Sequence, residues 1–144
     1  MDLEDALAAT DVGADVVLDT RELSVVGYAE QSGTRFAAAL ECSAAEGAFS
    51  ECLDVLEPGG TCVEVALTPE APALPLFHMI SDGLRVVGSC AFSDDTYRSV
   101  VDHLIGGQVP VDRLISERVS LADTPDALVR LRTPGSLVRI LSRP

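Results

Sequence analysis

With 144 residues, of which 47 % are hydrophobic and 23 % charged, the chain is long enough to bury the core of one domain. Its formal net charge of −13 argues against nucleic acid and anionic membranes as partners, because both attract basic surfaces. No apolar run reaches membrane-spanning length and the acidic N-terminus is unlike a signal peptide, so we expect a cytoplasmic protein. The four cysteines have no C-x-x-C spacing, which predicts reduced, buried thiols rather than a zinc site or a redox pair.

The first half of the chain alternates short apolar runs with helical stretches, a pattern typical of a parallel α/β sheet. Residues 1–12 match no strong pattern and could contain a short helix. The elements expected next are a short strand at 14–18, a weak helix at 21–31, a buried strand at 35–42, a helix at 44–56 and a strand at 61–67. Ser32–Gly33 is expected to break the first of these helices, and Pro58-Gly59-Gly60 to end the second.

The second half continues the alternation of strands and helices. The expected elements are a loop at 69–75, a helical turn at 76–81, a buried strand at 84–91, a helix at 94–105, a strand at 114–119, a helix at 121–131 and a terminal strand at 136–141. Asp123 or Thr124 is a plausible cap for the last helix, with Pro125 in its first turn. No linker interrupts the pattern, so we expect a single domain over residues 1–144.

The order and spacing of several segments resemble one known family. These segments are 13–19 (GADVVLD), 39–43 (ALECS), 53–65 (LDVLEPGGTCVEV), 84–89 (LRVVGS), 104–109 (LIGGQV) and 138–141 (VRIL). Together they resemble the C-terminal stretch of medium-chain, zinc-binding alcohol dehydrogenases, and the sorbitol, butanediol and threonine dehydrogenase branches are most alike. The resemblance begins at about residue 10 and implies an α/β fold: an incomplete Rossmann-type parallel sheet with flanking helices, from the C-terminal part of the nucleotide-binding domain.

The same resemblance indicates what the sequence lacks. The family's zinc-carrying catalytic domain has no counterpart here, and neither has the first βαβ unit with its G-x-G-x-x-G turn. Gly59-Gly60 and Gly106-Gly107 both follow predicted helices and are not phosphate-binding turns. His78 and His103 belong to no cluster of metal ligands. We therefore expect a truncated protein that holds no metal and cannot transfer hydride alone.

The resemblance implies that four residues are remnants of a cofactor site: Ser43, Ala66, Ser89 and Cys90. Ala44 and Ala66 stand where the family usually has glycine, which lets the cofactor pass close to the backbone. The two added methyl groups argue against tight dinucleotide binding. The expected cofactor is therefore none, with NAD(P) as the alternative if a partner chain supplies the Gly-rich turn.

Three functions stay open. In the first, the protein is a repurposed, cofactor-independent acid–base enzyme, an isomerase, cyclase or lyase acting on a small metabolite. Its candidate catalytic residues are Glu41, His78 and Cys42. Burial at a strand end is expected to raise the pKa of Glu41; the alternative is a carboxylate that is hydrogen-bonded to a neighbouring loop. Packing and an inert thiol are the alternatives for His78 and Cys42.

In the second function, the chain is one subunit of a split zinc- and NAD(P)-dependent alcohol dehydrogenase. In the third, it is a non-catalytic binding or scaffold protein. All three must cover the edge of the strand expected at 35–42, because the strand that would normally pair with it is missing. A second copy, a partner chain or the segment 14–19 could cover this edge. Since the family also has a subunit edge near 114–119, we expect a homodimer or higher homo-oligomer, with a small molecule as a possible ligand.

Overall fold

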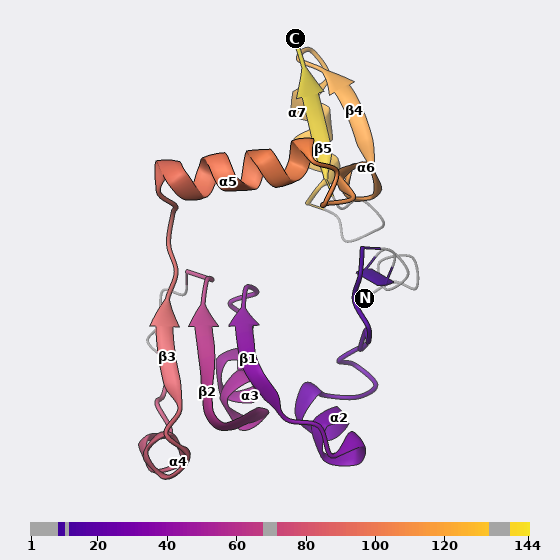
Figure 1. Cartoon of the computed structure of the whole chain (residues 1–144). Coiled ribbons are helices and arrows are strands. Elements are labelled where there is room, and N and C mark those ends of the chain that lie inside the picture. Colours follow the sequence, from indigo (N-terminus) through magenta and orange to yellow (C-terminus); the bar gives the residue numbers. More distant parts are fainter. Residues whose placement is uncertain (1–8, 11, 68–71, 133–138) are drawn as a thin grey trace. The chain divides into compact units, whose positions relative to one another are not determined.

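The computed structural model describes residues 9–10, 12–67, 72–132 and 139–144 (Figure 1). Its contacts group into two compact units. One unit comprises Thr20–Ala91, and the other comprises the described residues before Thr20 and after Ala91. That residues 1–144 form a single domain stays a prediction. Among the described helices, none is both long and apolar enough to cross a lipid bilayer.

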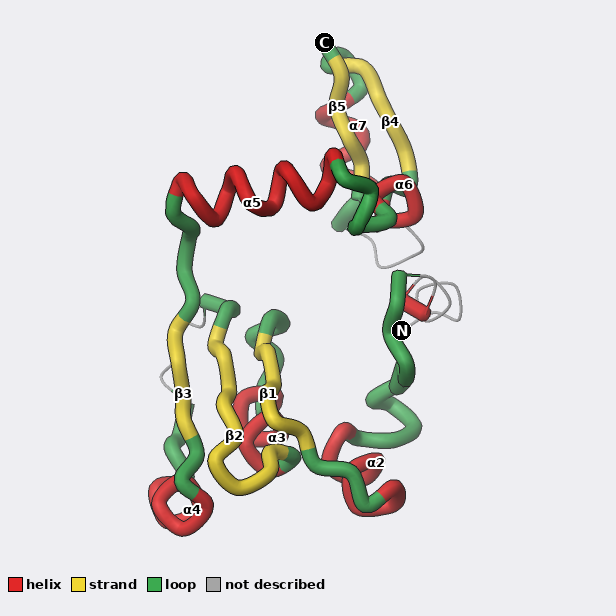
Figure 2. Tube along the Cα trace, in the orientation of Figure 1, coloured by secondary structure: helices red, strands yellow, loops and turns green. Residues whose placement is uncertain are grey.

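The unit Thr20–Ala91 contains a parallel sheet with the strand order β1-β2-β3 (Figure 2). Its elements are α2 (Val25–Ser32), β1 (Phe36–Glu41), α3 (Ala48–Asp54), β2 (Leu56–Glu64), α4 (Leu76–Asp82) and β3 (Arg85–Gly88). The register pairs Glu41 with Glu64 and Glu64 with Gly88, so the three strands end at the same level. This arrangement confirms the predicted α/β class with parallel strands and flanking helices.

The core of this unit forms where α3 packs on the sheet. Leu53, Leu56 and Cys62 are almost completely buried, and Phe49 and Leu84 complete the buried cluster. The five side chains come from α3, from β2 and from the residue before β3. Their burial fixes the orientation of α3 against the strands, and with it the end of the loop that joins β1 to α3.

The first helix of this unit has favourable capping residues, whereas the second begins later than expected from the sequence. Ser24 caps α2 by accepting a hydrogen bond from the Gly27 amide at 3.0 Å, and Gly33 ends this helix with φ 68°, which confirms the predicted break. The helix predicted at 44–56 is shorter, because Ala44 (φ 53°) and Gly47 (φ 82°) are left-handed and postpone its start to Ala48.

The interpretation of Pro58-Gly59-Gly60 as the end of α3 is wrong. The helix already ends at Asp54, and the three residues lie inside β2. Gly59 has φ 83°, and the register between β1 and β2 shifts here, so that Phe36 pairs with Leu56 but Ala38 pairs with Thr61. The Pro-Gly-Gly sequence therefore forms an irregularity in the strand rather than a helix terminator.

The strand predicted at 14–18 is also wrong, because the structure has no regular secondary structure there. A strand is held by hydrogen bonds to a neighbouring strand, and among the described strands β1 pairs with β2 alone. The possible helix at the N-terminus lies mostly outside the described residues.

The other unit contains a two-stranded parallel sheet flanked by helices. Its elements are α5 (Asp94–Ile105), α6 (Val111–Leu114), β4 (Glu117–Ser120), α7 (Thr124–Arg130) and β5 (Ile140–Arg143). The helix predicted at 94–105 is confirmed, and Ser93 caps it by accepting a bond from the Thr96 amide at 3.2 Å. The strand predicted at 114–119 begins later, because the residues before it form α6. The predicted terminal strand at 136–141 falls partly outside the described residues.

Candidate functional site

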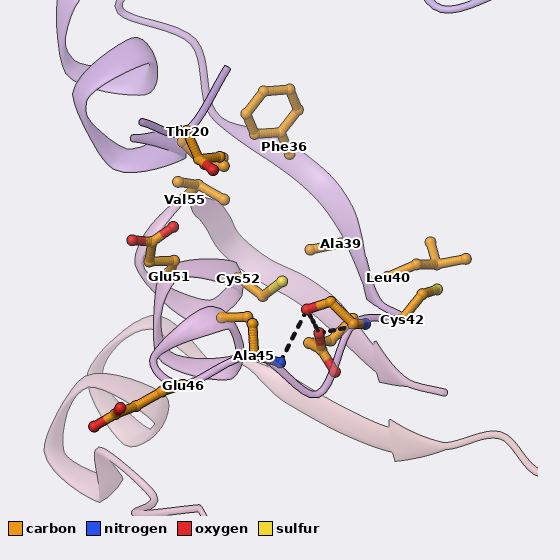
Figure 3. Close-up of a pocket in the computed structure, with 14 residues that line it drawn as sticks. Thr20, Phe36, Ala39, Leu40, Cys42, Ala45, Glu46, Glu51, Cys52 and Val55 are labelled. Carbon is orange, nitrogen blue, oxygen red and sulfur yellow. Dashed lines mark hydrogen bonds between the residues drawn. The ribbon is translucent and has the colours of Figure 1, made fainter. Parts of the chain in front are cut away.

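A pocket of about 850 Å³ lies beside β1 and α3 within the unit Thr20–Ala91 (Figure 3). Most of its surface is apolar, and its charged lining residues are all carboxylates: Glu41, Glu46 and Glu51. Neither arginine nor histidine is among its lining residues. The remaining lining residues are Thr20, Val25, Phe36, Ala39, Leu40, Cys42, Ser43, Ala45, Ala48, Cys52 and Val55. The pocket therefore suits a neutral or positively charged group better than a phosphate.

The carboxylate of Glu41 organises the turn that follows β1. Its Oε1 accepts hydrogen bonds from the Ser43 amide at 2.7 Å, from the Ser43 hydroxyl at 2.6 Å and from the Ala44 amide at 3.1 Å. The Ser43 oxygen in turn accepts a bond from the Ala45 amide at 3.1 Å (Figure 3). Glu41 itself is 3 % exposed, so these bonds replace the water that a carboxylate normally binds.

The expectation that burial raises the pKa of Glu41 is wrong. The hydrogen bond donated by the Ser43 hydroxyl is the strongest influence on this group, and with the amide bonds of Ser43 and Ala44 it lowers the pKa of Glu41 in spite of burial. Three donors on one carboxylate stabilise its charged form more than desolvation penalises it. The alternative, a carboxylate that is hydrogen-bonded to a neighbouring loop, describes the structure.

Glu64 is the titratable residue at this site that the sequence analysis missed. It pairs in register with Glu41, and the two side chains share a hydrogen bond. Burial, this bond and the charge of Glu41 raise the pKa of Glu64, so it retains a proton more readily than an ordinary glutamate. The available signal was positional, because both residues occupy the last position of adjacent parallel strands, but Glu64 stands in an otherwise apolar run.

The backbone brings three of the four predicted cofactor-site residues to the ends of the strands. The Ala66 amide donates to the Glu41 carbonyl at 3.2 Å, and the Ser89 amide donates to the Glu64 carbonyl at 2.8 Å. Ser43 lies in the turn organised by Glu41. Ser43, Ser89 and Cys90 are exposed, and Ala66 is partly buried. The strand ends therefore carry two exposed serines, of which Ser43 lines the pocket.

His78 lies at the opposite end of the sheet from Glu41. It belongs to α4, and its ring nitrogens lie 3.6 Å from a carboxylate oxygen of Asp54 and 3.3 Å from one of Asp82. Asp54 is the last residue of α3, just before the start of β2, whereas Glu41 is the last residue of β1. The structure therefore does not bring the three predicted catalytic residues together, because only Glu41 and Cys42 line the pocket.

The expectation of buried thiols holds for only some of the four cysteines. Cys62 is buried and Cys52 partly buried, whereas Cys42 and Cys90 are exposed, and all four are free. Burial raises the pKa of Cys52 to about 12 and also raises that of Cys62. Both thiols therefore stay neutral and unreactive at physiological pH. The described residues contain no group of three histidine, cysteine or acidic side chains that could hold a metal ion.

Comparison with known proteins assigns this fold to a family. A model of the zinc-binding dehydrogenases matches residues 3–106, which is well over half of the chain. The chain belongs to the zinc-binding dehydrogenase family. Among its relatives is an alcohol dehydrogenase of Geobacillus stearothermophilus, 21 % identical over 130 residues that make up 90 % of this chain and 39 % of the relative.

Solved structures of this family confirm the predicted fold. The 2R,3R-butanediol dehydrogenase of Bacillus subtilis superposes with a TM-score of 0.88 and 20 % identity, and covers 100 % of this chain but 42 % of its own. An alcohol dehydrogenase of Escherichia coli CFT073 in complex with NADH gives a TM-score of 0.89 at 14 % identity, over 96 % of this chain and 41 % of its own. The zinc-binding dehydrogenase chain described here thus spans about two fifths of its relatives' length and corresponds to the C-terminal part of their nucleotide-binding domain.

Proposed function

We propose that this chain forms the nicotinamide side of an NAD(P) site in a zinc-type alcohol or polyol dehydrogenase, and that hydride transfer needs further polypeptide carrying the zinc ligands and a Gly-rich turn. The observation that carries the proposal is the turn at Ser43–Ala45. It lies at the carboxyl end of β1, where ligands of parallel α/β sheets bind. The hydrogen bonds of Glu41 hold it in shape without a ligand.

The backbone at Ala44 supports this reading. Its φ of 53° is a left-handed conformation that favours glycine, which is the residue the family resemblance implies at this position. The added methyl group has therefore not converted the turn to another conformation. Glu41 accounts for this, because its carboxylate accepts bonds from the Ala44 amide at 3.1 Å and 3.2 Å.

The chemistry of the pocket fits one end of the dinucleotide and not the other. Ribose hydroxyls and a carboxamide can donate to Glu46 or Glu51, which line the pocket. A pyrophosphate finds no arginine or histidine among the lining residues, and the amides of the Ser43–Ala45 turn already donate within the turn. The net charge of −13 adds repulsion. The phosphates therefore require groups from other polypeptide, and so does zinc.

The experiment that tests this proposal compares two uncharged halves of the cofactor. Reduced nicotinamide riboside and adenosine are titrated separately into the ¹⁵N-labelled chain, and amide shifts are followed by NMR. We expect the riboside to shift the amides of Ser43, Ala45 and Ser89, with adenosine producing smaller effects. Equal shifts with adenosine, or riboside shifts confined to other residues, would overturn the assignment of the nicotinamide side.

Cofactor-independent acid–base catalysis is the second candidate, and Glu64 is the observation that favours it. The raised pKa of Glu64 suits this carboxyl group to general acid catalysis, and the lowered pKa of Glu41 beside it favours the ionised form. Cys42 lines the pocket and is exposed. His78 takes no part in this version, because it lies at the other end of the sheet.

Proton exchange at carbon distinguishes this candidate from the dehydrogenase reading. Small enolisable ketones and hydroxy acids are incubated with the chain in D₂O, and loss of their α-proton signals is followed by NMR. Acid–base catalysis predicts exchange that disappears in Glu64→Gln and Glu41→Gln and persists in His78→Gln. Absence of exchange for the whole panel, or exchange that survives both glutamate variants, removes this candidate.

We also propose that β1 is covered in the working protein by another polypeptide or by a second copy. β1 is the first strand of the sheet, and no described strand pairs with its outer edge. Leu40 on this strand is 65 % exposed, although it follows the apolar pattern of a buried strand. Light scattering after size exclusion gives the mass of the species in solution, and a monomer at all concentrations would contradict a homo-oligomer.

A further inference from the structure

The ends of β1 and β2 are tied together through two glutamates. Glu41 and Glu64 are partners in the parallel register, and each ends its strand. The Val65 amide donates to the Glu41 carbonyl at 2.9 Å, so the backbone fixes the two residues side by side. The register therefore places their carboxyl groups close to one another.

The two carboxyl groups have opposite surroundings. Glu41 accepts bonds from Ser43 and Ala44, all from groups that favour a negative charge. Glu64 has a buried Oε2 with no hydrogen-bond partner among the described residues. A buried, unpartnered oxygen is tolerated in a neutral carboxyl group far better than in a carboxylate. These surroundings favour a proton on Glu64 rather than on Glu41.

We propose that Glu64 is a positioning residue: the proton that it shares with Glu41 holds the Ser43–Ala45 turn in shape, and loss of that proton loosens the turn. When Glu64 ionises, its carboxylate and the adjacent buried carboxylate of Glu41 repel each other. Movement of Glu41 relieves this repulsion, and its bonds to Ser43 and Ala44 break as it moves. Ala44 then loses the contacts that hold it at φ 53°.

Two thiols face the pair, and neither changes charge between about pH 4 and about pH 9. Cys52 of α3 and Cys62 of β2 interact electrostatically with both glutamates, but burial raises the pKa of both thiols, that of Cys52 to about 12. The register partner of Glu64 on β3 is Gly88, which has no titratable side chain. Glu41 is already ionised, because its hydrogen bonds lower its pKa. Within the pair, Glu64 is therefore the group that responds as the pH rises.

As a consequence, the shape of the pocket depends on pH. Ser43 and Ala45 line the pocket, so a looser turn changes its shape while leaving the core around Leu53 and Leu56 in place. The inference concerns the turn itself and does not depend on the turn bordering a nicotinamide. Failure of cofactor binding would leave it standing, and its own failure would leave the proposed cofactor site untouched.

NMR on the ¹³C,¹⁵N-labelled full chain tests this inference directly. The Glu64 carboxyl shift and the Ser43 and Ala44 amide shifts are followed from about pH 4 to about pH 9. We expect all three to move with one shared midpoint above the ordinary glutamate value, and the protection of the Ser43 amide from exchange to fall about tenfold across it. Separate midpoints for the Glu64 carboxyl and the Ser43 amide would overturn the inference.

Two variants separate positioning from a purely structural role. In Glu64→Gln the side-chain amide still donates to Glu41 but cannot ionise, so the Ser43 and Ala44 amides should cease to titrate while the turn stays ordered. The control is Glu51→Gln, which removes a carboxylate that lines the same pocket and should leave the titration unchanged. A Ser43 titration that persists in Glu64→Gln contradicts the inference. If this variant does not fold, the shared midpoint in the unmodified chain still decides.

Discussion

Glu64 on β2 and Glu41 on β1 are register partners whose pKa values are displaced in opposite directions, Glu64 upward by burial and Glu41 downward by the bonds of the Ser43–Ala45 turn. Because the two groups interact, they titrate as a pair that holds one proton over an intermediate range of pH. This relationship links the sheet to the loop that borders the pocket, and several measurable consequences follow from it.

Stability should depend on pH in two opposed limbs. Because the pKa of Glu64 is raised in the folded state, this residue contributes its full stabilisation at pH values below the ordinary glutamate pKa. The stabilisation is lost as the pH rises through the raised pKa. Because the pKa of Glu41 is lowered in the folded state, this residue contributes its full stabilisation at pH values above the ordinary glutamate pKa. That stabilisation is lost as the pH falls through the lowered pKa. Urea denaturation across the pH range should show Glu64→Gln losing the alkaline limb of the pair and keeping the acid limb. An unchanged profile in that variant would contradict the assignment.

Ser43→Ala should destabilise the protein and move the acid limb to higher pH. The substitution removes the hydroxyl that lies 2.6 Å from Glu41 and lowers its pKa most. A hydrogen bond to a charged group contributes about 1.5–3 kcal/mol, and the solvent near the turn places the expected loss at the low end. Ser89→Ala, at another strand end, serves as the control and should change the unfolding free energy by less than about 0.5 kcal/mol.

Ala44→Gly should stabilise the chain, unlike most alanine-to-glycine changes. At φ 53° an alanine is strained by about 1–2 kcal/mol, which glycine relieves, while the extra freedom of glycine in the unfolded state offsets about 0.5–1 kcal/mol. The matched control is Ala38→Gly in β1, where no strain is relieved and stability should fall. Chemical denaturation measures both, and equal destabilisation by the two changes would refute the strain at Ala44.

The four thiols should fall into two kinetic classes with a maleimide reagent near neutral pH. Cys42 and Cys90 are exposed and should react quickly, whereas Cys62 is buried and the raised pKa of Cys52, about 12, leaves almost no thiolate. Mass spectrometry of peptides after timed quenching assigns each site. Labelling of Cys52 as fast as that of Cys42 in the folded protein would show that the pocket is open to this side chain.

The sequence predicted the class of fold well, because hydrophobic periodicity and helix-capping residues determine secondary structure locally. The helix at Asp94–Ile105 and the strand ending at Glu41 follow from hydrophobic pattern and from capping residues. The strand predicted at 14–18 failed for the opposite reason. Its apolar pattern is right for a strand, but a strand also needs a partner, and partners are supplied by parts of the fold distant in sequence.

The candidate site was predictable in position but not in chemistry. That Glu41 ends a strand could be read from its apolar neighbours, whereas the direction of its pKa depended on three donors that only the folded turn provides. Glu64 was missed because its significance arises from register with Glu41. His78 was grouped with them on residue type alone, and the topology puts it at the other end of the sheet.

The central claim is that this chain supplies one side of a cofactor site and is incomplete without further polypeptide. Calorimetric titration of the purified chain with NADH and with NADPH tests this claim most directly. The account predicts binding no tighter than about 1 mM, equivalent to roughly 4.1 kcal/mol, since nothing among the pocket residues holds the pyrophosphate. Binding tighter than about 100 µM, roughly 5.5 kcal/mol, would show a cofactor site complete within this chain and would contradict the account.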